Sequence, residues 1–139
     1  EKYIAFFKTV TQQTKTMVLH WQRVGFVHGV MNTDNMSVHG ITIDYGPYGW
    51  LEGYDHHWTP NTTDSQFKRY TYGSQMEIGH WNLYQLANAL YPLIGETADL
   101  ERILHSYHKN VLYRIWDSWF LKDTATKIVI RTTCPLPKY

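Results

Sequence analysis

The sequence predicts an α+β fold that is mainly helical and carries one short β-hairpin. Three long segments repeat apolar residues at every third or fourth position, which is the spacing of amphipathic helices. Two short β-like runs flank a His-Gly pair, and a long segment rich in glycine, proline, asparagine and threonine separates them from the second helix. The order of elements is therefore helix, hairpin, long loop, helix, helix.

The first predicted helix runs from Tyr3 to Val24. Its apolar face is made by residues three, four or seven positions apart, namely Tyr3, Phe7, Val10, Met17 and Trp21. Gly25 follows at the position where a C-terminal cap belongs. Phe26-Val27 is a short apolar step into the next segment.

The predicted hairpin pairs Met36–Val38 with Ile41–Ile43 around a two-residue turn at His39-Gly40. From Asp44 to Gln75 the chain has no steady periodicity, and we expect a long ordered loop. Loops of this length inside a compact domain are often functional.

The second predicted helix covers Ile78 to Leu90 and stops near Pro92. The third covers Leu100 to Trp119, with Thr97 as its cap and Asp99 in its first turn. Beyond it, Ile128–Ile130 is a candidate strand and Cys134–Pro137 a candidate extended tail.

Composition excludes several classes of protein. The 139 residues suffice for one domain, and a net charge of +1 leaves no broad basic surface for nucleic acid. One cysteine, Cys134, excludes an internal disulfide and a cysteine-based zinc site. We find no secretory signal and no apolar run of about 18 residues that could span a bilayer. We therefore expect an intracellular protein without nucleic-acid or membrane partners.

Aromatic residues make up 16% of the chain, which is more than a chain of this size usually buries alone. We expect part of this aromatic surface to pack against something outside the chain.

Hard oxygen ligands flank the predicted hairpin. If its strands pair, Asn35 and Asp44 stand at the open end, roughly 5 Å apart across the strands. Mg²⁺ suits such a place, because it takes few protein oxygens and completes its octahedron with water and phosphate oxygens. Asp34 precedes the first ligand and could accept a proton from an attacking hydroxyl. The alternative is that asparagine and aspartate are simply common turn residues.

The wider spacing favours the metal interpretation. Protein kinases carry a His-Arg-Asp loop whose metal-binding asparagine lies seven residues after the histidine, followed by Asp-Phe-Gly. Here His28 and Asn35 are seven residues apart, and Asp44-Tyr45-Gly46 stands in the place of Asp-Phe-Gly. Val30 occupies the position of the kinase catalytic aspartate and cannot accept a proton. Ordinary kinase chemistry is therefore not expected.

At this point the chain resembles a known family. The segments WQRVGFVHGVMNTDNMS from Trp21 to Ser37, TIDYGP from Thr42 to Pro47, and WNL from Trp81 to Leu83 are similar to those of the selenoprotein O family. The resemblance implies the helical C-terminal lobe of a protein-kinase-like fold over residues 1–95. Residues 96–139 would add a C-terminal helix and a tail.

The resemblance also implies an activity. Members of this family, often labelled pseudokinases, transfer AMP from ATP to Ser, Thr or Tyr hydroxyls of proteins, with Mg²⁺ and possibly Mn²⁺. Matched by motif, Asp34 is the proton acceptor, Asn35 is a Mg²⁺ ligand, and Asp44 is a Mg²⁺ ligand that also lies against the nucleotide. The implied compartment is mitochondrial in a eukaryote and cytoplasmic in a bacterium.

Other functions stay open. Only 27 residues precede His28, so we expect the N-terminal lobe, with its glycine-rich loop and Lys-Glu pair, to be absent and the fragment alone to be inactive. A catalytically inactive module that binds nucleotide or acts as a scaffold is the main alternative, favoured by Val30. An ordinary phosphotransferase is the third. Redox control is not expected, because Cys134 stands alone.

Further candidates have competing interpretations. Asp55-His56-His57 could reach a metal, although a solvated loop is expected. His105 and His108 share a helix face without a carboxylate at zinc-protease spacing, which favours an exposed surface. His28 is expected to be a packed residue that holds the loop. The segment Trp58–Tyr72 could either shape a groove for a protein substrate or seal the lobe.

Overall fold

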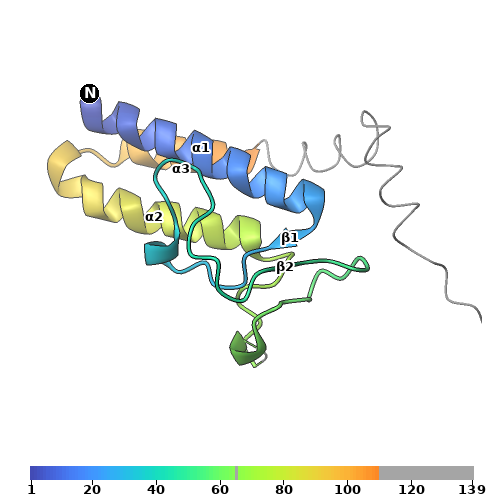
Figure 1. Ribbon diagram of the computed structural model, residues 1–139. Helices are drawn as coiled ribbons and strands as arrows, with labels where there is room; N and C mark the ends of the chain where they lie inside the picture. The colour runs from blue at the N-terminus through green and yellow to red at the C-terminus, as the bar shows by residue number, and fades with distance from the viewer. Residues whose placement is uncertain (65, 110–139) are drawn as a thin grey trace, which may run out of the picture.

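The computed structural model describes residues 1–64 and 66–109. Three helices lie side by side, and the non-helical segments gather at one end and along one side of them (Figure 1). In the described residues, the helices are α1 (Lys2–Val24), α2 (Gln75–Ile94) and α3 (Ala98–Lys109), and a two-stranded sheet pairs β1 (Phe26–Val27) with β2 (Gly49–Trp50). The α+β class is confirmed.

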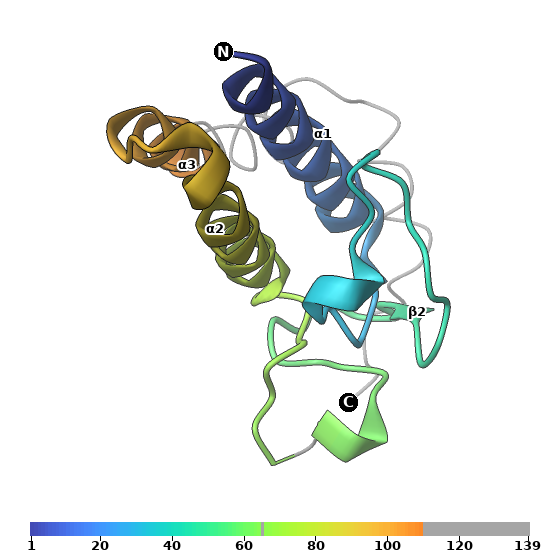
Figure 2. The same ribbon diagram turned by 90° about the vertical axis from the view of Figure 1, so that its left-hand side faces the viewer.

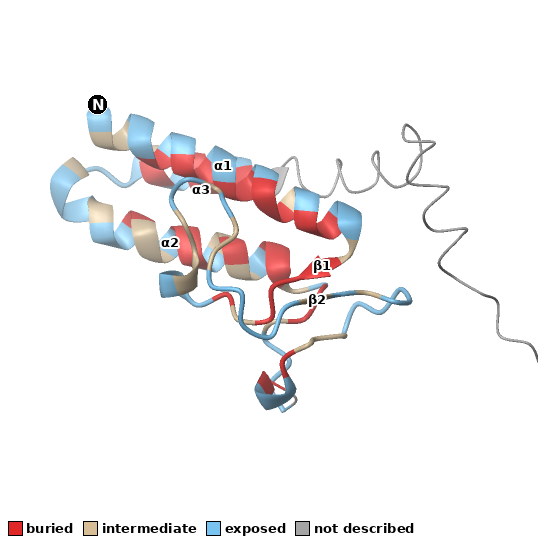
Figure 3. Cartoon of the chain, in the orientation of Figure 1, coloured by how far each residue is buried: buried red, intermediate tan, exposed pale blue. Residues whose placement is uncertain are grey.

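Helix α1 matches the prediction. Gly25 ends it in the left-handed conformation, φ +70°, and its N–H is bonded to carbonyls of the last turn. The apolar stripe faces inward, and Figure 3 shows the buried side of α1 turned toward the other helices. The core cluster unites all three helices and the segment after α1, through buried residues that include Phe7, Val18, Met31, Leu83, Leu104 and Tyr107.

Helix α2 begins earlier and ends later than predicted. It starts at Gln75 and continues through Pro92 to Ile94, where Gly95 takes the left-handed conformation with its N–H bonded to the Tyr91 carbonyl at 2.9 Å. The helix therefore ends near Pro92, as expected, but two residues beyond it. Proline is tolerated there because it lies exposed in the last turn, where water can hydrate the carbonyl that loses its helical partner.

Helix α3 confirms the predicted third helix as far as it is described. The Thr97 carbonyl accepts the N–H of Glu101 at 2.9 Å, and Asp99 lies in the first turn. Leu100, Leu104 and Tyr107 are buried as the spacing predicts. The later predictions lie outside the described residues, namely the helix beyond Lys109, the strand Ile128–Ile130 and the tail Cys134–Pro137.

The sheet is not the one that the sequence predicted. Phe26 pairs with Trp50 and Val27 with Gly49, so the apolar step after α1 is a strand and its partner lies in the expected loop. Sequence periodicity could not find strands of two residues, because they contain too few positions to show alternation. The other described residues between 44 and 74 are irregular, apart from a 3₁₀ turn at Thr62–Asp64.

The predicted hairpin reduces to a single antiparallel bridge, Met36 with Thr42. Its turn spans Ser37 to Gly40, closed by the Gly40 N–H on the Ser37 carbonyl at 3.2 Å, so the two-residue turn at His39-Gly40 is wrong. Gly40 has φ +63°, and a Cβ there would lie 2.6 Å from Cβ of Gln13 on α1. The turn therefore needs glycine at this position to pack against α1. The pairing is shifted by one residue from the predicted one, because Met36 faces Thr42 and not Ile43.

The arrangement positions one short loop. Residues 28–35 leave β1 and cross the end of the helices, between α1 and α2 on one side and the 44–74 segment on the other (Figure 2). No helix in the described part of the chain is long and apolar enough to cross a membrane.

Candidate functional site

His28 is a buried anchor at the start of this loop, as expected. Its ring packs 5.5 Å from that of Trp21, and its Nδ1 accepts the N–H of Val30 at 3.4 Å. With Nδ1 accepting, the proton belongs on Nε2, which then donates to the Ile43 carbonyl at 2.8 Å. His28 therefore joins the loop to the residue before Asp44.

Helix α2 holds the loop through two buried amides. Gln75 accepts the backbone N–H of His28 at 3.0 Å and donates to the Phe26 carbonyl at 2.9 Å. Two turns further along α2, Asn82 donates to the Met31 carbonyl at 2.9 Å. These bonds satisfy the backbone of a segment that has no partner strand over most of its length. Gln75 was not singled out from the sequence, and Asn82 only as part of the WNL motif.

Asp34 and Asn35 lie on a 3₁₀ turn, Thr33–Asn35. Asn35 donates from Nδ2 to the Val30 carbonyl at 3.1 Å, so the nitrogen of its amide is used within the loop. Its Oδ1 is left as the atom that could bind a cation. Asp34 is exposed. A solvent-accessible carboxylate thus stands next in sequence to an amide that its own loop orients.

Asp44 is exposed and has a strained backbone. Its φ of +54° lies in the left-handed region, and its carbonyl accepts the N–H of Gly46 at 2.8 Å. Such conformations persist where the surroundings impose them and cluster at functional sites. Continuing the pairing of Met36 with Thr42 sets Asn35 opposite Ile43, so Asp44 stands one residue beyond the position that the hairpin predicted.

The donor set suits a hard cation. Asn35 and Asp44 offer an amide and a carboxylate oxygen, the kind of ligands that Mg²⁺ prefers when water and phosphate complete its octahedron. No group of three or more His, Cys, Asp or Glu side chains in the described residues could hold a metal ion unaided. A cation here would therefore need further oxygen ligands, such as water.

The segment before α2 folds around two polar side chains that the sequence analysis did not single out for this role. Asn61, buried, donates Nδ2 to the Gly29 carbonyl at 3.0 Å. Asp64, also buried, accepts the backbone N–H groups of Arg69 at 3.0 Å and Tyr70 at 2.7 Å. The Asn61 bond attaches the segment to the loop, and the Asp64 bonds brace the segment internally.

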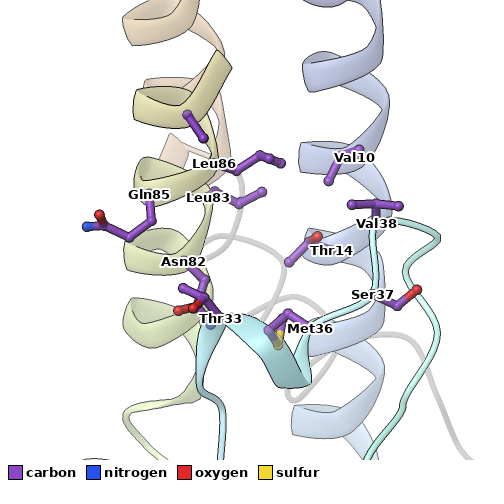
Figure 4. A pocket seen from close by; sticks show the side chains of 11 residues that line it. Val10, Thr14, Thr33, Met36, Ser37, Val38, Asn82, Leu83, Gln85 and Leu86 are labelled. Carbon is purple, nitrogen blue, oxygen red and sulfur yellow. The ribbon is translucent and has the colours of Figure 1, made fainter. Parts of the chain in front are cut away.

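A cavity of about 310 Å³ lies behind the loop, between α1, α2 and residues 33–38 (Figure 4). Its walls are mainly apolar and include both neighbours of the Asp34-Asn35 pair, Thr33 and Met36. Asn82 lies in the wall, and its buried Oδ1 has no hydrogen-bond partner within the described chain. The loop thus rests on incompletely filled space.

Aromatic rings extend from Asp44 along the exposed side of β2. Tyr45, Tyr48 and Trp50 meet edge to face at 5.3 and 5.6 Å, and Tyr45 is 61% exposed. Phe26 of β1 lies beneath them, 5.3 Å from Trp50. This is the kind of exposed aromatic surface that the composition predicted.

In the described part of the chain, the remaining candidates bring no set of metal ligands together. Asp55 accepts the backbone N–H of His57 at 2.8 Å, while the His56 ring is bonded to the Tyr54 hydroxyl, so the side chains of this exposed turn serve local contacts. His105 is exposed on α3, and the side chain of His108 lies outside the described residues.

Comparisons with known proteins agree with the motif. Residues 1–123 match the family described as Protein adenylyltransferase SelO. This match extends past residue 95, where the resemblance of the motifs ends. Relatives named Protein nucleotidyltransferase YdiU include those of Flavobacterium johnsoniae, 74% identical over 107 residues (77% of this chain, 20% of the relative), and Nitrosospira multiformis, 64% over 101 residues (73% and 18%). That of Xanthomonas campestris is 51% identical over 128 residues (92% and 24%). The chain spans about a fifth of the length of these relatives.

Proposed function

The chain belongs to the SelO family, and from that membership we propose that, in a polypeptide of the relatives' length, it transfers AMP from ATP to Ser, Thr or Tyr hydroxyls of proteins. Its fold would then be part of the helical C-terminal lobe of a kinase-like fold. The observation that carries the proposal is the exposed Asp34 beside the oriented Asn35 amide, on a loop that His28 joins to Asp44.

In the proposed reaction Asp34 accepts the proton of the acceptor hydroxyl while the hydroxyl oxygen bonds to the α-phosphorus of ATP. The bond from that phosphorus to the bridging oxygen breaks, and pyrophosphate leaves with the electron pair. Asp34 suits this role because it is exposed next to the proposed ligands without being needed as one. Val30, at the position of a kinase base, takes no part.

Asn35 and Asp44 would hold the cation and the phosphates. The Asn35 oxygen is available because the amide nitrogen is bonded to the Val30 carbonyl. The hydrogen bond between His28 and the Ile43 carbonyl fixes the position of the backbone just before Asp44. Bound Mg²⁺ would offset the charge of the phosphates. The protein's contribution is to hold these oxygens before the nucleotide arrives, so that less ordering is needed on binding.

A nucleotide-binding module without catalysis is the second candidate. It is favoured by Val30, and the exposed Tyr45 beside Asp44 would serve binding equally well. Of the compartments expected from the resemblance, the cytoplasm is the one we propose, because the named relatives are bacterial proteins.

The test is transfer of radiolabel from ATP to protein. A polypeptide of the relatives' length that contains this chain is incubated with ATP labelled at the α- or the γ-phosphate, with Mg²⁺ or with a chelator, beside its Asp34→Asn variant. Label from the α-phosphate alone, dependent on Mg²⁺ and on Asp34, is the expected result. Label from the γ-phosphate would show phosphorylation instead, and ATP binding without transfer of either label would establish the binding module.

A further inference from the structure

Asn32 begins the 3₁₀ turn that carries Asp34, yet its side chain does not cap that turn. Asparagine at this position normally accepts a backbone N–H of the first turn. Here only the backbone carbonyl of Asn32 does so, from Asn35 at 3.0 Å, and no side-chain cap is formed. The Asn32 amide is therefore not used for local structure.

Tyr70 explains where the amide goes. Its hydroxyl donates to Asn32 Oδ1, from a segment 38 residues further along the chain. Tyr70 is itself held, because the buried Asp64 carboxylate accepts its backbone N–H at 2.7 Å and Arg69 lies over its ring, 5.6 Å from the centroid. A rigid donor thus fixes the orientation of the amide from outside the loop.

This orientation of the Asn32 amide determines which of its atoms remain available to bind a ligand. With Oδ1 accepting from Tyr70, the two N–H groups of Asn32 point the other way, and they make no hydrogen bond in the described structure. Asn32 is exposed, two residues before Asp34. A pair of oriented donors three residues before Asn35, a proposed oxygen ligand, suits an anion, because amide N–H groups bind phosphate oxygens while carboxylates repel them.

We propose that Asn32 is a further nucleotide-binding residue, whose Nδ2 donates to phosphate oxygens of ATP, and that Tyr70 is the residue that positions it. The proposal rests on the proposed function only for the presence of ATP at this loop. It adds a neutral donor to a site otherwise built of carboxylates and acceptor oxygens.

A purely structural role for the bond is less consistent with the contacts. The segment is already attached to the loop by Asn61 on the Gly29 carbonyl and is braced internally by Asp64. Loss of one exposed hydroxyl should therefore leave the fold in place. Its effect should appear in the affinity for ATP.

The test uses a polypeptide of the relatives' length, with Asn32→Asp, Asn32→Ala, Tyr70→Phe and, as a matched control, Tyr84→Phe on the exposed side of α2. Calorimetry measures the affinity for ATP with Mg²⁺, thermal unfolding measures stability, and single-turnover transfer at saturating ATP measures chemistry. Asn32→Asp keeps the acceptor for Tyr70 but replaces both donors with a charge.

We expect Asn32→Asp and Asn32→Ala to weaken ATP about 10- to 100-fold, as for a hydrogen bond to a charged group, and Tyr70→Phe about 3- to 10-fold. Unfolding midpoints and the rate at saturating ATP should stay near those of the unchanged protein. Unchanged ATP affinity in both Asn32 variants, or in Tyr70→Phe, would overturn the proposal. If the unchanged polypeptide transferred no AMP but the Asn32 and Tyr70 variants still bound ATP more weakly, the proposed function would be refuted and this inference would stand.

Discussion

The ring of His28 donates from Nε2 to the carbonyl of Ile43, 2.8 Å away, and so joins the loop that bears Asp34 to the residue before Asp44. The two segments share one antiparallel bridge, Met36 with Thr42, and are otherwise unpaired. The buried His28 side chain therefore holds the two segments together, as the backbone hydrogen bonds of a longer ladder would in a regular hairpin. The separation of the proposed catalytic and metal-binding residues depends on it.

Replacing His28 with phenylalanine should destabilise the chain while preserving the shape of the ring. The change leaves the half-buried Ile43 carbonyl and Val30 N–H without their side-chain partner, and an unpaired buried polar group costs about 1–3 kcal/mol. We expect a loss of about 2–4 kcal/mol in the free energy of unfolding, measured in urea. His39→Phe, at the exposed turn, is the control. Equal stability of the two variants would show that the ring acts only by packing.

Asp34→Asn should lower AMP transfer and leave ATP binding in place. The amide cannot take a proton from the acceptor, and a general base contributes about 10²- to 10⁴-fold to the rate. Because Asp34 is exposed, the unfolding midpoint should not move. Single-turnover transfer and calorimetry on the longer polypeptide separate the two effects. A variant that lost ATP affinity instead would assign Asp34 to binding.

Two substitutions separate the charge of Asp44 from its backbone. Asparagine tolerates the left-handed φ of +54°, whereas alanine pays about 1–2 kcal/mol for it. Both should abolish Mg²⁺-dependent ATP binding, but Asp44→Ala alone should also lower stability. Calorimetry with Mg²⁺ and with a chelator, together with urea unfolding, checks this. Retained Mg²⁺-dependent binding in Asp44→Asn would remove Asp44 from the proposed ligands.

Asp64→Asn should loosen the segment that packs on the loop. The carboxylate accepts two backbone N–H groups, and the amide can accept with only one of its two terminal atoms. We expect a loss of about 1.5–3 kcal/mol in unfolding free energy, the value of a hydrogen bond to a buried charge. Asp55→Asn is the matched control, because Asp55 accepts one backbone N–H in an exposed turn. Faster amide exchange at Arg69 and Tyr70 would place the effect in the segment.

Sequence periodicity predicted the elements that bury a repeated apolar face. All three helices were found because their stripes extend over several turns, and Gly25 was found because a left-handed cap has a residue preference. The second helix was predicted too short, since proline stops a helix by local rules that do not apply in an exposed last turn.

The strands and the anchors of the site were not accessible in this way. A strand of two residues shows no alternation, and the turn register depends on the approach of Gly40 to Gln13, which is a contact between distant residues. The motif pointed to Asp34, Asn35 and Asp44 as candidates, whereas Gln75 and Asn61 bond to backbone groups 47 and 32 residues away in the sequence. No local pattern marks a polar side chain as a long-range partner, and only the folded chain reveals it.

Two buried tyrosines should make the chain sensitive to alkaline pH. Tyr107 is fully buried and donates to the Met76 carbonyl at 3.1 Å, and Tyr72 donates to the Gln22 carbonyl at 2.7 Å. Burial raises the pKa of both hydroxyls well above the ordinary value, and at Tyr72 the charge of Tyr54 adds to the rise. Each hydroxyl thus stays protonated in the folded chain at a pH where it ionises in the unfolded one.

The sign of the effect follows from proton binding. Above about pH 10 the unfolded chain holds fewer protons than the folded chain, so stability present below that pH falls as the pH rises toward the raised pKa, by about 1.4 kcal/mol per pH unit for each tyrosine. Tyr107→Phe removes the contribution of one of the two tyrosines, so the unfolding free energy should fall less steeply with pH. The variant also loses the hydrogen bond to the Met76 carbonyl, which lowers stability at every pH. Urea unfolding between pH 8 and about pH 11, within the range where only the unfolded tyrosine ionises, measures the slope. The exposed Tyr84→Phe should leave that slope unchanged, and a Tyr107→Phe slope as steep as that of the unchanged chain would show that Tyr107 ionises without unfolding.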